Sequence, residues 1–202
     1  MKLLSFFRGK TVDFYGDFVD PFGYIGFHNL RLAAEAAGVR IRWRGFELEP
    51  ETPDEGYQFQ TAENSHLRAG MWPSVQGFAQ QAGLTIRDPG FAPRTQLAHR
   101  LALNLPEKSG QKYPLIEAIY QAYLNEQKNI GERPILIEIA EKFGVSKQVA
   151  INALNKTQHH ALARHRAEAA AHRFPGMPAY RFRNQTLFGA LPSAHWRQVF
   201  KS

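Results

Sequence analysis

The residues whose types could take part in chemistry are Asp20-Pro21-Phe22-Gly23. They lie between an apolar run typical of a strand, Val12–Tyr15, and a helix that begins at Tyr24 or just before it. Aspartate followed by proline is a helix-start signal, because the carboxylate accepts backbone N–H groups and proline has none to leave unpaired. The first helical turn also carries free N–H groups and the positive end of the helix dipole. A strand that leads into a helix is therefore a common place for chemistry in α/β proteins.

Asp20 has two possible roles at this junction. As a helix cap it would contribute about 1 kcal/mol to stability. As a catalytic residue it would act as a general base, which at neutral pH requires a raised pKa. A carboxylate at a helix N-terminus is stabilised as the anion, so we expect the pKa of Asp20 to fall. The sequence favours the cap and leaves the general base open.

Composition limits the possible functions. The chain has 202 residues, 44% of them hydrophobic, which is enough for a sizeable core in one domain or in one domain with an insertion. The formal net charge of +7 suits an acidic partner without identifying one. There is no cysteine, which excludes disulfides, thiolate metal sites and cysteine nucleophiles formed by this chain alone.

The first ten residues, MKLLSFFRGK, have an apolar stretch of only Leu3 to Phe7, interrupted by Ser5. A secretory signal needs about 7–15 apolar residues, so we expect a short lead-in and a cytoplasmic protein. No apolar run reaches the length that spans a membrane.

The order of elements predicts an α/β fold with a helical insertion. A strand, a helix that ends at Gly38 and a second strand at Val39–Arg44 form a βαβ unit. From about residue 55 to Phe174 the patterns are helical only. After that block come two short strands around a turn and a last helix. The predicted later elements are helices at Trp72–Gln81, Thr95–Leu105, Tyr113–Gln127, Pro134–Phe143, Ser146–Asn155, Thr157–Arg173 and Ala194–Phe200, and strands at Ala179–Phe182 and Thr186–Phe188.

Histidines are frequent on the predicted helix Thr157–Arg173. His159, His160, His165 and His172 include no pair at the i, i+4 spacing that places two metal ligands side by side. We therefore expect no metal site and interpret this helix as an exposed, basic and pH-sensitive face.

Four stretches, in this order, resemble one known family: VDFYGDFVDPFGYIG, WRGFELEP, the pair RTQLAHR and EAIYQAYLNEQKNIGE, and GMPAYRF with LFGALP. The chain resembles the DsbA-like branch of the thioredoxin superfamily, with its FrnE-like, 2-hydroxychromene-2-carboxylate isomerase and kappa glutathione transferase relatives. The resemblance covers about Thr11 to Phe200.

The resemblance implies a thioredoxin fold with an inserted all-helical domain. Residues 1–52 and 157–202 would form the discontinuous thioredoxin-like domain, and residues 53–156 the insertion. It also implies that Pro178 is cis. The loop around Pro178 would face the N-terminus of the first helix and hold a peptide or glutathione.

The chain departs from the family at positions 20–23, where redox relatives carry C-x-x-C and the isomerase and transferase relatives carry serine first. Thiol–disulfide exchange needs a thiolate, so this chain cannot perform it alone. A negative charge at Asp20 would also oppose ionisation of a bound thiol by about 1–3 pKa units. Neutral or cationic ligands are then favoured.

Three functions stay open at this stage. The first is a family member without thiol redox activity that keeps a small-molecule or peptide cleft. The second is a glutathione-dependent isomerase or transferase, with glutathione as its cofactor. The third is a non-catalytic binding module for an acidic partner. We expect no membrane or nucleic-acid partner, and the sequence leaves a homodimer open. The candidate catalytic residue is Asp20, and the candidate substrate-binding residues are Pro21, Phe22, Gly23, Tyr24, Trp43, His99, Met177 and Pro178.

Overall fold

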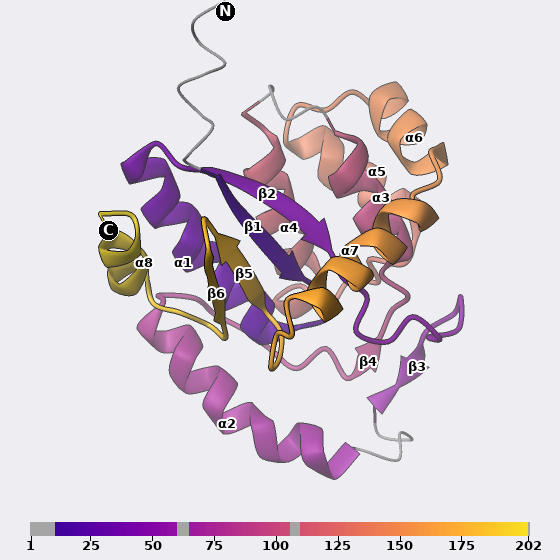
Figure 1. Ribbon diagram of the computed structural model, residues 1–202. Coiled ribbons are helices and arrows are strands. Elements are labelled where there is room, and N and C mark those ends of the chain that lie inside the picture. The colour runs from indigo at the N-terminus through magenta and orange to yellow at the C-terminus, as the bar shows by residue number, and fades with distance from the viewer. Residues whose placement is uncertain (1–10, 60–64, 106–109, 202) are drawn as a thin grey trace, which may run out of the picture.

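Both ends of the chain build one four-stranded sheet (Figure 1). The computed structural model describes residues 11–59, 65–105 and 110–201, so the predicted lead-in lies outside the described residues. The sheet order is β2-β1-β5-β6, with β1 and β2 parallel and the other neighbours antiparallel. The strand bounds are β1 Thr11–Gly16, β2 Arg40–Gly45, β5 Ala179–Phe182 and β6 Gln185–Phe188. The predicted α/β class and the pairing of the two chain ends are confirmed.

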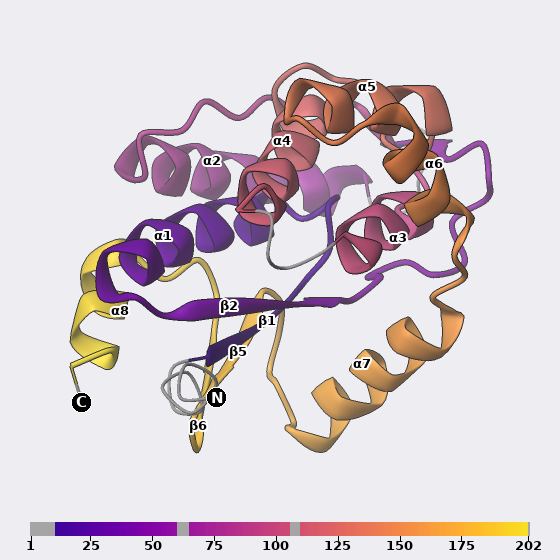
Figure 2. The same cartoon turned by 90° about the horizontal axis from the view of Figure 1, so that it is seen from above.

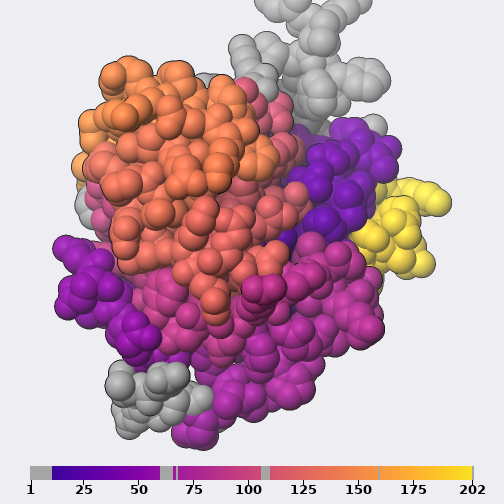
Figure 3. Space-filling model, turned by 180° about the vertical axis from the view of Figure 1, so that it is seen from behind, coloured from indigo at the N-terminus to yellow at the C-terminus, as the bar shows by residue number. Residues whose placement is uncertain are grey.

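Helices cover both faces of this sheet. Seen from above, α7 lies on one side of the sheet, and α1 lies on the other side together with the helices of the middle of the chain (Figure 2). The face in Figure 3 shows how much of the surface those middle helices provide, with α1 and α8 visible at one edge. The helix bounds are α1 Pro21–Ala37, α2 Ser65–Gln81, α3 Gln96–Asn104, α4 Lys112–Leu124, α5 Arg133–Lys142, α6 Lys147–Asn155, α7 His159–Ala171 and α8 Ser193–Val199.

Two details of the predicted helical block were wrong. Strands β3 (Tyr57–Gln58) and β4 (Phe91–Ala92) pair as a small antiparallel sheet, so the region is not purely helical. Two residues are too few to show the alternation that identifies a strand. Helix α2 also begins seven residues before Trp72, the predicted start. Proline is common in the first turn of a helix and rare in its interior, but Pro73 lies inside this helix.

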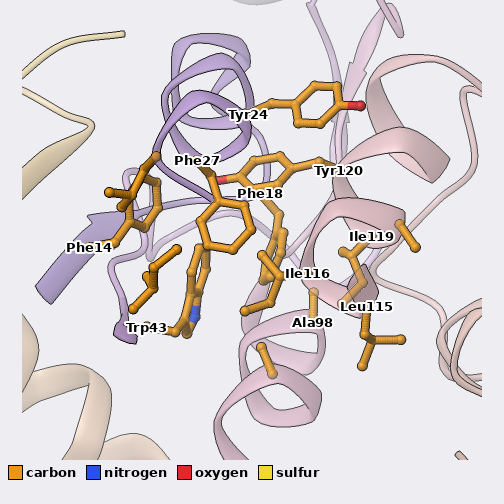
Figure 4. Packing of buried hydrophobic residues seen from close by; sticks show 14 of the residues in the cluster. Phe14, Phe18, Tyr24, Phe27, Trp43, Ala98, Leu115, Ile116, Ile119 and Tyr120 are labelled. Carbon is orange, nitrogen blue, oxygen red and sulfur yellow. The ribbon is translucent and has the colours of Figure 1, made fainter. Parts of the chain in front are cut away.

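The hydrophobic core is continuous from the sheet into the middle helices. Aromatic rings form its centre: Phe14 stacks on Trp43, Trp43 on Phe18, and Phe18 contacts Tyr120 of α4 (Figure 4). Phe27 of α1 meets both Phe14 and Trp43 edge to face. This core joins residues from both proposed domains, and the division at residues 52/53 and 156/157 stays a prediction. Of the helices in the described ranges, none combines the length and apolar character needed to cross a bilayer.

Helix α1 approaches strand β5 closely because Gly26 has no side chain. A Cβ atom at Gly26 would lie 2.2 Å from the hydroxyl oxygen of Tyr180 and 3.2 Å from Cγ of Pro178. The Tyr180 hydroxyl is held in place by donating to the carbonyl of Gly189 over 2.9 Å. Gly26 thus sets the distance between α1 and the Pro178 loop.

We predict that Gly26→Ala lowers the free energy of unfolding by about 1–3 kcal/mol, because the added methyl group overlaps the Tyr180 hydroxyl. The matched control is Gly77→Ala in α2, where a Cβ meets nothing within 4 Å. That control should be neutral or gain up to about 1 kcal/mol from helix propensity. Urea unfolding measures both, and a Gly26→Ala variant as stable as the control would contradict the close approach.

Candidate functional site

Asp20 caps helix α1. Its backbone is extended, with φ −87° and ψ 111°, and its Oδ1 accepts a hydrogen bond from the backbone N–H of Phe22 over 2.9 Å. Pro21 occupies the first turn, where it leaves no N–H group unpaired. The predicted cap is confirmed, and the helix begins three residues before Tyr24.

The carboxyl group of Asp20 is also buried. The residue is 7% exposed, and its second oxygen, Oδ2, is buried without a hydrogen-bond partner. Burial raises the pKa of Asp20 to about 7, and the negative charge of Asp17 adds to this, although backbone N–H groups of the first turn oppose it. The expectation that this pKa falls was wrong, because the helix-end argument left out desolvation. Asp20 therefore changes protonation state near neutral pH, as a general acid or base requires.

A second buried carboxylate lies beside it. Asp17 accepts hydrogen bonds from the backbone N–H groups of Phe18 and Leu48, each over 2.7 Å. Its Oδ1 also lies 3.1 Å from Nε2 of His99, which is fully buried. Asp17 ties the β1–α1 junction to the segment after β2 and to helix α3. It also supplies the charge that acts on Asp20.

Asp20 opens onto a pocket of about 150 Å³. Arg68 of α2 forms one wall: its guanidinium lies 3.5 Å from the ring centre of Phe59 and 3.0 Å from Oδ1 of Asp88. Most of the remaining lining is apolar, and Glu49 adds a carboxylate. The lining residues are Val19, Asp20, Pro21, Leu48, Glu49, Phe59, Arg68, Met71 and Ala92.

Of the predicted substrate-binding residues, Pro21 lines this pocket together with Asp20. Tyr24, Trp43 and His99 lie in the hydrophobic core. Aromatic residues next to a motif are also the residues that a core recruits, and here their rings pack on Phe18 or Tyr120. These three side chains are therefore not part of the pocket lining.

Two other predicted residues, Phe22 and Gly23, lie around the same helix end, and a third, Met177, packs in a separate cluster. Phe22 is half-buried and contacts the ring of Phe78 in α2 edge to face. Gly23 is buried beside Asp20. Met177 packs outside the pocket with residues of β1, α7 and β5.

The Met177–Pro178 peptide bond is cis. The carbonyl of Pro178 accepts a hydrogen bond from the N–H of Gly189 over 2.7 Å. The loop touches α1 at Gly26, one turn beyond Gly23. Neither Met177 nor Pro178 lines the pocket at Asp20.

Seven residues of the pocket lining were not predicted from the sequence, and they are spread along the chain between Val19 and Ala92. Their positions depend on how α2 and the segment around β3 fold back over the β1–α1 junction, which no local pattern reports. The spacing of Arg68 and Trp72 was a weak signal. They lie four residues apart on one helix face, and the guanidinium carbon of Arg68 is 5.4 Å from the centre of the Trp72 ring.

The histidines of α7 are not a single exposed face. His165 is buried, its Nδ1 lies 3.3 Å from the carbonyl oxygen of Gly45, and burial lowers its pKa to about 4. The interpretation of His165 as part of an exposed pH-sensitive surface was wrong, because that side of α7 packs on β2. In the described part of the chain, no three histidine, aspartate or glutamate side chains gather as a metal site.

Comparison with known proteins decides the family. The model of the DSBA-like thioredoxin domain matches residues 11–200. The chain belongs to this family. YwbO, an uncharacterized protein of Bacillus subtilis (strain 168), is 28% identical over 134 residues, which cover 65% of this chain and 64% of YwbO.

Solved structures share the fold. A probable DsbA oxidoreductase, SCO1869 from Streptomyces coelicolor, has a TM-score of 0.80 at 21% identity, covering 95% of this chain and 88% of that one. The cytosolic disulfide reductase DsbM from Pseudomonas aeruginosa has a TM-score of 0.70 at 19% identity, covering 95% and 97%. A 2-hydroxychromene-2-carboxylate isomerase has a TM-score of 0.68 at 19% identity, covering 89% of each.

The chemistry that the structure shows lies at one helix end. The chain has no cysteine, and the carboxyl group of Asp20 occupies the N-terminus of α1. The carboxyl retains the cap, as its contact with Phe22 shows. It brings a group that titrates near neutral pH to the edge of a small, mostly apolar pocket.

The raised pKa of Asp20 predicts a specific pH dependence of stability. An aspartate ordinarily titrates near 3.8, and Asp20 does so near 7 when folded. Between these values the folded state binds more protons than the unfolded state, so stability falls as the pH rises. Relative to Asp20→Asn, which keeps a capping side chain, the wild type should lose up to about 4 kcal/mol from pH 4 to pH 7.

Denaturant unfolding of both proteins at each pH measures this difference. Asp54→Asn removes a carboxylate whose side chain is 87% exposed and serves as the surface control. The quantity compared is the free energy of unfolding of the wild type minus that of Asp20→Asn. If this difference does not change between pH 4 and pH 7, or changes no more than the corresponding difference for Asp54→Asn, the buried state of Asp20 is contradicted.

Proposed function

We propose that this DsbA-like protein has no thiol–disulfide exchange activity of its own and binds a small uncharged or cationic molecule, or a peptide segment, at Asp20. The observation that carries the proposal is the replacement of the family's first cysteine by a buried carboxyl group that lines a pocket. The thioredoxin frame is retained, while the sulfur that would attack a disulfide is missing from the whole sequence.

The charges around the pocket support this ligand class. Asp20 and Glu49 bring two carboxyl groups, and the cation in the lining, Arg68, is already paired with Asp88 and stacked on Phe59. An anion entering the pocket would meet these carboxyl groups without an uncommitted positive charge to offset them. The apolar residues Leu48 and Met71 suit an aliphatic or aromatic body.

Redox activity is tested by reduction of insulin with dithiothreitol. We expect the purified wild type to give no rate above dithiothreitol alone, because it offers no thiolate. The double variant Asp20→Cys with Gly23→Cys recreates C-x-x-C on the same helix end and should raise the rate above that background. Clear turnover by the wild type would refute the proposal, whatever the double variant does.

A glutathione-dependent isomerase or transferase is the second candidate. Its support is the fold shared with the 2-hydroxychromene-2-carboxylate isomerase and with DsbM, which has also been solved with GSH. Both likenesses are below 25% identity and carry the fold alone. The charge on Asp20 opposes this candidate most strongly above pH 7, where the carboxyl is ionised.

Calorimetric titration with reduced glutathione separates the two candidates. At pH 8 we expect the wild type to bind glutathione at least about tenfold more weakly than Asp20→Ser, because the anionic carboxylate opposes the thiolate and a serine hydroxyl can donate to it. At pH 6, where Asp20 is mostly protonated, this gap should narrow. Equal and tight binding by both proteins at pH 8 would favour the glutathione-dependent enzyme over the first proposal.

A further inference from the structure

A second pocket, of about 340 Å³, lies where the middle of α1, the end of α2 and the loop that leads into α8 meet (Figure 1). A volume above about 300 Å³ is typical of small-molecule sites. This pocket shares no lining residue with the pocket at Asp20, although α2 contributes to both. We call it the Asn29 pocket, and its lining residues are Asn29, Phe78, Gln81, Ala82, Ala190, Pro192, Ser193 and Ala194.

The side-chain amide of Asn29 is the buried polar group of this pocket. Asn29 is 7% exposed, and no residue in the described ranges hydrogen-bonds with its amide. Neither its oxygen nor its nitrogen is among the fully occluded unpaired atoms, so the amide opens onto the pocket that Asn29 lines. Buried polar groups nearly always have a hydrogen-bond partner. A partner for this amide therefore has to come from the pocket.

The Asn29 pocket is distant from the chemistry at Asp20. Asn29 lies nine residues further along α1, which corresponds to about 13 Å along the helix axis. In α2, Arg68 and Met71 line the pocket at Asp20, whereas Phe78 and Gln81 of the last turn line the Asn29 pocket. A molecule in one pocket therefore contacts a different set of side chains from a molecule in the other.

The walls of the Asn29 pocket are apolar. Ala82, Ala190 and Ala194 carry only methyl groups, which leave space between α2 and the loop before α8. The ring of Phe78 is 44% exposed, and its edge-to-face contact with Phe22, 5.9 Å between ring centres, restrains it at the pocket. An aromatic wall beside small side chains suits a flat ring of a ligand.

The remaining polar groups of the lining are uncharged. Gln81 adds a second amide, and Ser193 adds a hydroxyl whose oxygen accepts a hydrogen bond from Nη1 of Arg197 over 3.2 Å. The proton of that hydroxyl can then be donated to a ligand. Arg197 itself does not line the pocket, and no ionisable side chain is among the described residues that do. A charged ligand would lose its hydration here without gaining a counter-ion.

The amide of Asn29 determines the polar group that fits. A side-chain amide donates through its nitrogen and accepts through its oxygen. A carboxamide or a lactam presents an acceptor and a donor side by side, so it can form two hydrogen bonds with Asn29 at once. A hydrocarbon would leave the buried amide unpaired, which is unfavourable.

We propose that the Asn29 pocket is a second binding site, for a small uncharged molecule that has a flat ring and a carboxamide or lactam group. The ring lies against Phe78, and the carboxamide pairs with the amide of Asn29. This site is independent of the function proposed for Asp20 and would stand if that function were refuted.

Titration of the isotope-labelled full chain with benzamide, followed by nuclear magnetic resonance, tests the pairing. The side-chain amide signals of Asn29, identified by their absence in Asn29→Leu, should shift until they saturate. Toluene lacks the amide and benzoate carries a charge. We expect each to bind at least about fivefold more weakly than benzamide.

Two variants locate the site, and a third is their control. Asn29→Leu keeps a side chain of similar size without the amide, so it should weaken benzamide at least about fivefold and leave the weak binding of toluene unchanged. Ala194→Phe fills the pocket from an exposed position and should abolish binding of both, even if Asn29→Leu does not fold. Ala163→Phe places the same ring on an exposed position of α7 that lines neither pocket, and should leave benzamide affinity unchanged.

Three results would overturn the proposal. The first is benzamide binding that is as tight in Ala194→Phe as in the wild type, or shifts that never saturate. The second is benzoate binding as tight as benzamide, which would indicate recognition by Arg197. The third is benzamide binding that persists in Ala194→Phe and disappears in Asp20→Asn. That last result would assign benzamide to the pocket at Asp20 and would support the proposed function, so the two proposals can be told apart.

Discussion

Desolvation of one carboxyl group at the start of α1 is the interaction on which the rest of the site depends. The helix end offers Asp20 a hydrogen bond and a favourable dipole, and both stabilise the anion. Burial opposes the anion and is the larger effect, since the pKa of Asp20 rises to about 7 in spite of those contacts. A helix cap on the surface would be an inert carboxylate at neutral pH. The same cap, once buried, becomes a group that gains and loses its proton there.

The aromatic core creates this burial. Phe18, Trp43 and Tyr120 pack directly behind the junction of β1 and α1, so the end of the helix rests on rings instead of water. Two glycines let the backbone come that close: Gly26 against Tyr180, and Gly23 against Tyr120. The residues that look structural in this region, glycines and aromatic rings, therefore determine the electrostatics of the residue that looks functional.

The frame of the fold could be predicted from the sequence because its signals are local. The Asp-Pro start of α1, the glycine stop at Gly38 and the alternation in β2 each report on a few neighbouring residues, and the structure has these elements within a few residues of the predicted bounds. The candidate site was predicted less well. Its key residue was identified by position in the family pattern, but the direction of its pKa depends on rings contributed by distant elements. The pocket wall at Arg68 and Phe59 depends on chain segments about 40 residues further along, and periodicity carries no such information.

The burial of Asp20 distinguishes this site from a redox site that has only lost its cysteine. The helix dipole stabilises the charge of a thiolate at a helix N-terminus, so removal of the sulfur alone would leave a site that favours anions. In this chain the helix end carries a carboxyl group whose second oxygen, Oδ2, is buried beside Gly23. Below pH 7 the group is mostly a neutral acid that can donate a hydrogen bond, and above pH 7 it is an anion that prefers a donor or a cation. In the function that we propose, the protonation state of Asp20 decides which ligand is accepted. Burial sets that protonation state, and the glycines and rings of α1 and α4 maintain the burial.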